Sequence, residues 1–255
     1  MLSYSEFGPP DAPVILFLHP ANFDGRIWRK VIERLPDYRC VAVDLPGHGV
    51  SAGRDLTSFE AAADDVAEVI RAFRGPVAIV GLSLGAYVGF QCLVRHPILV
   101  DRAVLSGFQS APIRLGGLAR AGMAVSARLM AFRPIRDRMG RAMGVEDPAL
   151  LSSPDGRAVA SVRSSLRAAH LALAFDAGPH LAYATARTLV LAGEREHSAI
   201  RRSLPVFQAG LPECTARLVP GLGHAWAAKE PGLLAEIVSA WITDQPLPDR
   251  LSVPV

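Results

Sequence analysis

The sequence predicts an α/β fold with a mostly parallel central sheet, and two observations lead to this prediction. Short apolar runs without polar alternation recur along the chain, as expected of strands covered on both faces. Longer segments with the helical spacing of apolar residues separate these runs. With 255 residues, the chain has the size of one large domain, or of one domain that carries an insertion.

The predicted elements alternate in order. We expect strands at residues 14–18, 41–43, 77–80, 103–105, 188–191 and 217–219, and helices at residues 59–73, 84–95, 199–209 and 231–241. The 18 residues 77–94 carry no charge, which is the length of a membrane-spanning helix. Because glycines interrupt this segment, we interpret it as a buried strand that runs into a turn, and no membrane contact is expected.

The alternation breaks once, at residues 109–185, which show helical patterning only, with glycine and proline breakers. This segment is far longer than the roughly two to six residues usual for a connection between core elements. We therefore predict a helical cap at residues 109–185, inserted into a core formed by residues 1–108 and 186–255. The segment also holds ten arginines against five acidic residues.

The whole chain has 27 basic and 24 acidic residues, a formal net charge of +3. It contains no basic run of five residues and no basic stretch interleaved with aromatics, so nucleic-acid binding is not expected. The three cysteines match no zinc spacing and suit a reducing compartment, and no secretion signal is evident. We expect a cytoplasmic protein without metal or cofactor that acts on a small molecule; a homodimer is one possible state.

The pattern Gly81-Leu82-Ser83-Leu84-Gly85 follows a predicted strand and opens a predicted helix. In this context G-x-S-x-G places a serine on a sharp turn that tolerates only small neighbours, with its hydroxyl exposed at the sheet edge. The helix N-terminus that follows favours negative charge there. Ser83 is therefore predicted to be a nucleophile; the alternative is a packing turn with an inert serine.

Together with Leu18-His19-Pro20-Ala21 and with the segment from Asp44 to Ser51 (Asp-Leu-Pro-Gly-His-Gly-Val-Ser), this pattern resembles the α/β-hydrolase superfamily. The resemblance covers nearly the whole chain except the insertion. It implies an α/β-hydrolase fold and a catalytic triad in the order serine, acid, histidine. A serine at this turn argues against haloalkane dehalogenase and epoxide hydrolase activity, because those relatives carry aspartate there.

A serine hydroxyl needs a base, and seven histidines compete for that role. The triad order favours His224, which lies in a glycine-rich loop after the last predicted strand, where Gly223 is expected to let the imidazole reach Ser83. The resemblance places the acid three residues after Gly193, which is Glu196. Glu194 remains the competitor for this role.

A tetrahedral intermediate needs two backbone donors. The resemblance assigns one donor to Leu84, directly after the nucleophile. It assigns the other to Ala21, because the family donor is generally the residue after the glycine of His-Gly-X, and in this chain Pro20, which has no N–H, replaces that glycine. Asn22, Phe108 and Trp226 are the expected substrate contacts. Apolar cap residues are expected to roof the site, namely Leu118, Met123, Leu129 and Phe132.

These residues predict a serine hydrolase that cleaves a carboxylic ester of a small to medium, largely apolar substrate through Ser83, Glu196 and His224. A second interpretation applies the same triad to an enol-lactone, a thioester or a carbon–carbon bond. It requires a substrate carboxylate that a cap arginine would pair with. A third interpretation is a ligand-binding member of the fold without catalysis.

Overall fold

The computed structural model describes residues 1–254 except 115, 131, 143–144, 146 and 154–157. The side chains of residues 119, 120, 123, 139, 142 and 148 are likewise outside the described part.

A single sheet forms the centre of the molecule. Its seven strands in the described part of the chain are β1 (Tyr4–Phe7), β2 (Val14–Leu18), β3 (Arg39–Val43), β4 (Val77–Leu82), β5 (Val100–Ser106), β6 (Arg187–Gly193) and β7 (Cys214–Val219). The order across the sheet is β1-β3-β2-β4-β5-β6-β7. β1 pairs antiparallel with β3, and every other pairing is parallel. This topology confirms the predicted α/β fold with a mostly parallel sheet.

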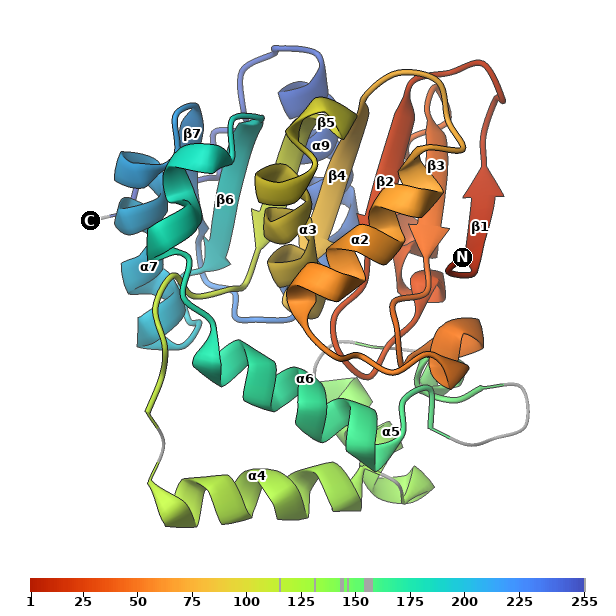
Figure 1. Cartoon of the computed structure of the whole chain (residues 1–255), viewed down its shortest axis with the longest axis vertical. Coiled ribbons are helices and arrows are strands. Elements are labelled where there is room, and N and C mark those ends of the chain that lie inside the picture. The colour runs from red at the N-terminus through yellow and green to blue at the C-terminus, as the bar shows by residue number, and fades with distance from the viewer. Residues whose placement is uncertain (115, 131, 143–144, 146, 154–157, 255) are drawn as a thin grey trace.

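Helices cover both faces of this sheet. The described α-helices are α1 (Arg29–Ile32), α2 (Phe59–Ile70), α3 (Leu84–Arg95), α4 (Gly117–Leu129), α5 (Arg133–Ala142), α6 (Val162–Ala174), α7 (Ser198–Gly210), α8 (Trp226–Lys229) and α9 (Pro231–Ile242). Short 3₁₀ turns are η1 (Gly25–Trp28), η2 (Gly49–Gly53), η3 (Pro97–Leu99), η4 (Pro148–Leu151) and η5 (Gly178–Tyr183). Helices α2, α3 and α7 lie on one face, and α9 lies on the other together with α1 (Figure 1).

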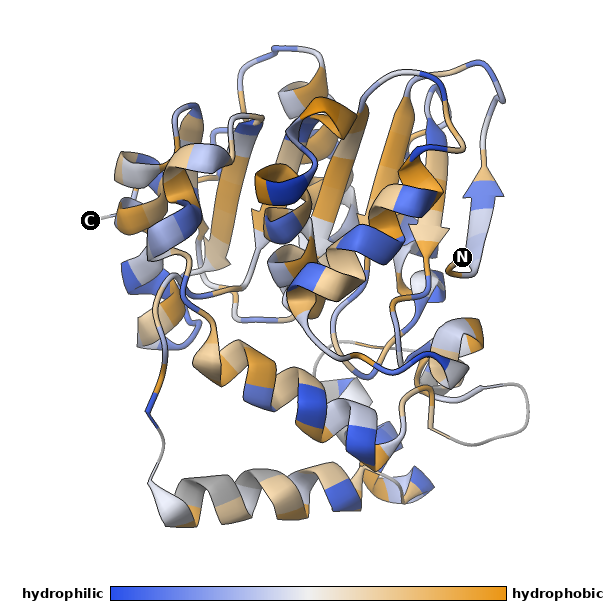
Figure 2. Cartoon of the chain, in the orientation of Figure 1, coloured by the Kyte–Doolittle hydropathy of each residue, from blue (hydrophilic) through white to orange (hydrophobic). Residues whose placement is uncertain are grey.

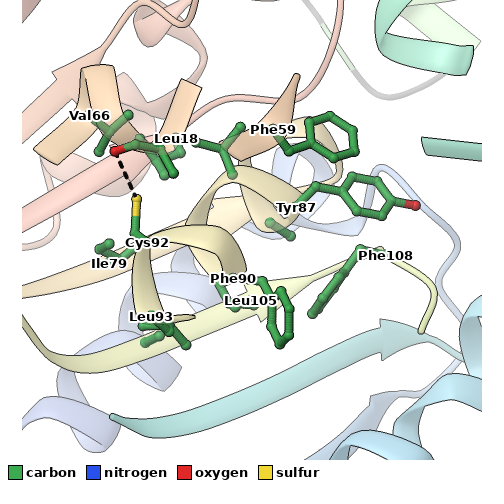
Figure 3. Close-up of a cluster of buried hydrophobic side chains, with 14 of the residues drawn as sticks. Leu18, Phe59, Val66, Ile79, Tyr87, Phe90, Cys92, Leu93, Leu105 and Phe108 are labelled. Atoms are coloured by element: carbon green, nitrogen blue, oxygen red, sulfur yellow. Dashed lines mark hydrogen bonds between the residues drawn. The ribbon is translucent and has the colours of Figure 1, made fainter. Parts of the chain in front are cut away.

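An aromatic cluster fills the space between the sheet and the first of these helix layers. Tyr87 stacks on Phe59 with ring centroids 4.8 Å apart, and Phe108 stacks on Phe207 at 4.4 Å. Figure 3 shows Phe59, Tyr87, Phe90 and Phe108 gathered beside Leu105 of β5. Only 2% of Phe108 is exposed. The expectation that Phe108 contacts substrate is therefore corrected: its ring belongs to the core, because burying an aromatic ring there stabilises the fold.

The segment between β5 and β6 contains α4, α5 and α6 and lies below the sheet in Figure 1. Helix α6 contacts both α3 and α4. Backbone contacts also join this segment to the loop after β3: the Gly49 N–H donates to the Val159 carbonyl at 3.2 Å, and His48 bridges to Ala160.

The apolar cap residues that we expected to cover the site are not buried over it where their side chains are described. Leu118 is 93% exposed and Phe132 is 62% exposed, and Leu129 also faces solvent. The side chain of Met123 lies outside the described part of the chain. Because α4 packs on α6 rather than on the sheet, its apolar side points away from the core, which helical periodicity alone does not reveal.

No helix in the described ranges has both the length and the apolar character needed to cross a bilayer.

The start of α3 approaches β2 more closely than a side chain would allow. A Cβ built on Gly85 overlaps the Leu18 carbonyl oxygen and comes within 2.8 Å of the Leu18 Cβ. A Cβ on Gly81 would lie 2.5 Å from the Gly85 carbonyl oxygen. Because the obstacles are mostly backbone atoms of a central strand, they cannot move aside without disturbing the sheet.

We expect the Gly85→Ala variant to lose about 3 kcal/mol of unfolding free energy, or to fail to accumulate as folded protein, because of this overlap. Urea denaturation followed by circular dichroism measures the loss. Gly122→Ala is the matched control, since a Cβ at Gly122 meets nothing within 4 Å. Equal stability of the two variants would show that α3 does not need this close approach.

Candidate active site

Ser83 occupies the turn between β4 and α3 in a strained backbone conformation. Its φ of 53° and ψ of −114° are unusual for a residue with a side chain and cost on the order of 1–3 kcal/mol. The Ser83 N–H donates to the Ser106 carbonyl of β5 at 2.8 Å, which fixes the turn to the neighbouring strand. The serine predicted as nucleophile therefore sits at the carboxyl end of a central strand and at the start of a helix.

His224 and Glu196 form a hydrogen-bonded pair. The His224 Nδ1 contacts Glu196 Oε1, while Glu196 Oε2 accepts the Gly193 N–H at 2.9 Å. The Glu196 side chain is 1% exposed, whereas that of His224 is 48% exposed. With Nδ1–H donated to the carboxylate, the imidazole keeps Nε2 as an acceptor for a proton.

Glu194 lies elsewhere in the same turn. Its Oε2 accepts the Gly221 N–H at 2.6 Å, and the Arg195 N–H donates to the Leu222 carbonyl at 2.8 Å. These bonds connect the turn that carries Glu196 to the loop that carries His224. Of the two candidate acids, the structure places Glu196 against the imidazole and Glu194 against the backbone of the histidine loop.

Glycines other than the one predicted let these loops meet. Gly221 has a φ of +71°, and a Cβ on Gly193 would lie 2.5 Å from the Leu222 carbonyl oxygen. Gly223 has neither a positive φ nor a close neighbour. A Cβ on Gly107 would come within 3.0 Å of the His224 ring, so this glycine lies directly beneath the pair. Gly193 and Gly221, rather than Gly223, therefore permit the loop path.

Trp226 holds the histidine loop from below. Its side chain is fully buried, and its Nε1–H donates to the Ser106 Oγ at 2.9 Å. The expectation that Trp226 contacts substrate is corrected: the indole points into the core. Ser106 binds the Ser83 N–H through its carbonyl and the Trp226 indole through its hydroxyl, so one residue of β5 connects the serine turn to the histidine loop.

Two backbone donors lie near Ser83. Neither the Ala21 N–H nor the Leu84 N–H has a hydrogen-bond acceptor among the described residues. Leu84 is the first residue of α3, and Ala21 lines the cavity described below. The neighbouring Asn22 has a φ of 68°, and its Oδ1 accepts the Ser165 hydroxyl of α6 at 2.5 Å. Asn22 thus links the loop after β2 to the insertion.

Two buried histidines support this loop from behind. The Leu45 N–H donates to His19 Nε2 at 2.9 Å, so His19 carries its proton on Nδ1 and donates to the Pro20 carbonyl. His48 Nδ1 pairs with the Pro46 carbonyl, and the two rings lie 5.1 Å apart. Burial lowers the pKa of His19 to about 4 and that of His48 to about 3, where the neighbouring His19 adds to the effect. Both are neutral framework residues, as their buried backbone contacts require.

A cavity of about 250 Å³ opens beside Ser83 and His224. Its lining consists of Pro20, Ala21, Asn22, Phe23, Ile27, Trp28, Leu82, Ser83, Val145, His224, Ala225, Ala227 and Ala228. Ser83 and His224 both line this space, and the described contacts include no hydrogen bond between their side chains. Such a bond is often long or absent before a ligand binds.

The lining is almost entirely apolar. His224 is the only ionisable side chain among the described lining residues, and Val145 is the only contribution from residues 109–185. A second, wider chamber of about 780 Å³ shares Ile27, Val145, Ala227 and Ala228 with the first. Its lining also includes the charged residues Arg26, Arg29, Lys30, Glu33 and Asp147. Small residues after His224 and apolar residues after Asn22 form much of these walls. Such residues are common in loops, so the sequence alone did not identify them as cavity-lining residues.

No cap arginine among the described side chains lines this cavity. Arg136 is buried and donates to the Ser152 hydroxyl, and Arg167 donates to the Leu56 carbonyl; both contacts are structural. Arg114, Arg128, Arg133, Arg138, Arg141 and Arg163 are exposed. Arg157 and the side chain of Arg120 lie outside the described part of the chain.

Other reactive groups are poorly suited to catalysis here. Burial raises the pKa of the Cys40 and Cys214 thiols to about 12, so neither is a thiolate at neutral pH. The described side chains also contain no group of three or more histidine, cysteine or carboxylate residues arranged to hold a metal ion.

Comparison with known proteins identifies a family for this arrangement. A sequence profile of the alpha/beta hydrolase family matches residues 15–237. Over 101 residues, 39% of each chain, the protein is 32% identical to a 2-succinyl-6-hydroxy-2,4-cyclohexadiene-1-carboxylate synthase of Enterobacter sp. (strain 638). Over 95 residues, 36% of each chain, it is 39% identical to a pimeloyl-[acyl-carrier protein] methyl ester esterase of Chromobacterium violaceum. The matches span less than half the length of these first curated relatives.

The solved structures extend the likeness over the whole fold. An E-2-(acetamidomethylene)succinate hydrolase superposes with a TM-score of 0.79, covering 95% of each chain at 23% sequence identity. At this identity the superposition establishes the shared fold.

The buried histidine pair predicts acid destabilisation. The pKa of an imidazole in the unfolded chain is about 6.5, whereas burial holds His19 near 4 and His48 near 3 in the folded chain. Below pH 6.5 the unfolded state therefore binds protons that the folded state does not. Their contribution to stability is complete above about pH 6.5 and falls toward pH 4, by up to about 1.4 kcal/mol per pH unit for each histidine.

Urea denaturation at a series of pH values tests this expectation. In His48→Asn the side-chain amide still donates to the Pro46 carbonyl, and the pH slope should be shallower than in the wild type. His170→Gln, which removes an exposed imidazole, should leave the slope unchanged. Identical slopes in all three proteins would exclude the buried pair as the cause.

For the contact between Trp226 and Ser106, we expect Trp226→Phe to lower the unfolding free energy by about 1–2 kcal/mol, because the buried Ser106 hydroxyl loses its donor. Amide hydrogen exchange of Val219, of residues 221–226 and of Ser83 should accelerate. Trp241→Phe is the control, since the buried Trp241 N–H has no partner among the described residues. If both variants leave exchange at Ser83 unchanged, the indole does not hold the two loops together.

Proposed function

The chain belongs to the alpha/beta hydrolase family, and from this premise we propose that it is a serine hydrolase that cleaves carboxylic esters of small to medium, apolar substrates. Ser83 is the nucleophile, His224 the general base and Glu196 the acid that orients the imidazole. The Ser83 turn and the hydrogen-bonded His224–Glu196 pair, which meet at one cavity, support these roles.

The proposed reaction follows from these positions. His224 Nε2 takes the Ser83 hydroxyl proton as Oγ attacks the ester carbonyl, and the Ala21 and Leu84 N–H groups bind the resulting oxyanion. His224 then returns the proton to the leaving alkoxide, which departs and leaves an acyl-enzyme. Water attacks this ester with His224 again as base, and Ser83 is regenerated. Glu196 stays ionised and stabilises the imidazolium in both steps.

The apolar lining of the cavity is the observation that carries the substrate class. Its volume of about 250 Å³ lies at the small end for ligand sites, which usually reach about 300–1,000 Å³. A short acyl chain fits such a space, and the wider chamber beyond Ile27 and Val145 has room for the alcohol group. The name of the Chromobacterium violaceum relative, an ester esterase, agrees with this proposal.

A second candidate is a reaction of the same triad on an enol-lactone, a thioester or a carbon–carbon bond of a carboxylate-bearing substrate. The Enterobacter relative, whose name is that of a carboxylate synthase, favours it. The cavity beside Ser83 disfavours it, because no described arginine lines that space. The adjoining chamber does carry Arg26, Arg29 and Lys30, together with Glu33 and Asp147, so a substrate carboxylate would have to extend into that chamber. Discrimination between acidic and neutral esters separates the two candidates.

We expect Ser83→Ala to abolish hydrolysis of short-chain nitrophenyl esters, and Glu196→Gln to lower kcat by roughly a thousandfold, because a neutral partner does not stabilise the imidazolium. Glu194→Gln keeps an acceptor for the Gly221 N–H and should retain most activity. Neutral short-chain esters should be preferred over acidic and long-chain ones.

Steady-state kinetics on the purified chain measures these effects, with circular dichroism as the check on folding. Full activity of Ser83→Ala would overturn the proposed nucleophile. A greater loss in Glu194→Gln than in Glu196→Gln would reverse the assignment of the acid. Absence of fluorophosphonate labelling at Ser83 would favour the third interpretation, a ligand-binding protein without catalysis.

A further inference from the structure

Large apolar side chains gather on the outer side of the insertion. We call Leu118, Val125, Leu129 and Phe132 the outer cap stripe. Their exposed fractions are 93%, 53%, 40% and 62%. Other exposed apolar residues, such as Ile98 and Val50, belong to separate parts of the chain. Since exposed apolar residues on a soluble domain are usually scattered, a row of four marks an interaction surface.

Three residues of the stripe lie on α4, and Phe132 follows the end of that helix. Leu118, Val125 and Leu129 are spaced by seven and four residues, which places them on one side of a helix. Half-buried Ala124 and Ala127 are on the other side, and α4 packs against α6. In Figure 1, α4 lies at the edge of the molecule farthest from the sheet. Figure 2 shows apolar residues along this outermost helix. The stripe is therefore directed outward.

The charge around the stripe has one sign. Residues 114–141 contain seven arginines and a single acidic residue, Asp137. Asp137 lies 3.7 Å from Arg133, and its side chain is 17% exposed. The exposed arginines of this segment are Arg114, Arg128, Arg133, Arg138 and Arg141. An apolar helix side flanked by arginines suits a partner that is apolar inside and negatively charged outside.

Although the sequence led us to expect no membrane contact, we propose that the outer cap stripe and its arginines bind the surface of an anionic lipid bilayer. The apolar side chains enter the boundary between headgroups and acyl chains, and the arginines contact lipid phosphates. A second copy of the chain fits less well, because α4 carries arginines and no acid, so two copies would bring like charges together. Such binding lies along the surface and requires no spanning helix.

Surface binding would turn the insertion toward the bilayer. The insertion lies at the carboxyl edge of the sheet, where Ser83 occupies the turn between β4 and α3. The edge that carries the candidate active site would thus face the membrane, where apolar esters partition. The binding itself does not depend on the proposed function, since it uses no residue of the cavity.

The test is co-sedimentation of the full chain with phosphatidylcholine vesicles, with and without phosphatidylglycerol. We expect binding to the anionic vesicles that weakens with salt, and little binding to phosphatidylcholine alone. Circular dichroism of each variant reports folding. Esterase activity, measured without vesicles, tests the proposed function independently of membrane binding.

Two pairs of variants separate the apolar and the electrostatic contributions. Leu118→Ser with Phe132→Ser should weaken binding to the anionic vesicles by roughly tenfold or more, whereas Val50→Ser with Ile98→Ser, which removes two equally exposed apolar residues elsewhere, should not. Arg128→Glu with Arg133→Glu should weaken it similarly. Arg71→Glu with Arg74→Glu makes the same change in net charge at exposed sites outside the insertion and should have a smaller effect.

Three results would overturn the proposal. The first is no binding to anionic vesicles. The second is binding that the control pairs reduce as much as the stripe variants do, which would indicate attraction by overall charge alone. The third is a dimer in light scattering that the Leu118→Ser and Phe132→Ser changes dissociate, which would assign the stripe to self-association.

Discussion

The close approach of backbone to backbone at the Ser83 turn is the constraint on which the rest of the structure depends. Ser83 adopts a positive φ, and the turn fits only because Gly81 and Gly85 lack side chains where the helix start meets Leu18 of β2. This approach requires β2, β4 and β5 to be in register, since Ser83 also donates to Ser106 of β5. The aromatic cluster beneath α3 holds the helix against the sheet, so the energy of the core maintains the strained residue.

The same edge of the sheet brings three separate loops together through backbone contacts. Ser106 connects the serine turn to Trp226, and the Gly107 N–H donates to Leu191 of β6. The turn after β6 is hydrogen-bonded to the loop that carries His224, through the Glu194 carboxylate and the Arg195 N–H. The pair formed by His224 and Glu196 therefore depends on strand register rather than on flexible side chains. Parallel strands place successive loops at one edge, which is why residues more than 100 positions apart in sequence form one site.

The sequence was sufficient for the features that depend on local pattern. Buried apolar runs predicted six of the strands. β1 was missed because Tyr4–Phe7 is only four residues long, holds Ser5 and Glu6 side by side and is mostly exposed at the sheet edge, so it forms no buried apolar run. The glycine spacing around Ser83 and the loop position of His224 were also local signals. Phe108 and Trp226 were misplaced because a large aromatic residue near a motif suits either a pocket wall or a core. Only the packing of α3, α7 and the sheet decides between the two, and no local pattern records that packing.

Local sequence pattern also did not reveal which way the cap arginines face. Their direction decides whether the positive charge of the cap, within a net charge of +3, acts on the substrate or on a partner outside the chain. A basic insertion above Ser83 suggested that any electrostatic preference would act on the substrate. In the structure, Arg136 and Arg167 are used for internal contacts. Arg114, Arg128, Arg133, Arg138 and Arg141 are exposed and belong to the same stretch of sequence as the exposed apolar side chains of α4. The insertion thus has two different sides: α6 holds the loop after β2 through Asn22 and Ser165, while α4 touches little besides α6. If α4 served only to complete the insertion, burying its leucines against the rest of the chain would stabilise the fold. The outward position of Leu118 beside arginines therefore argues for a partner outside the chain.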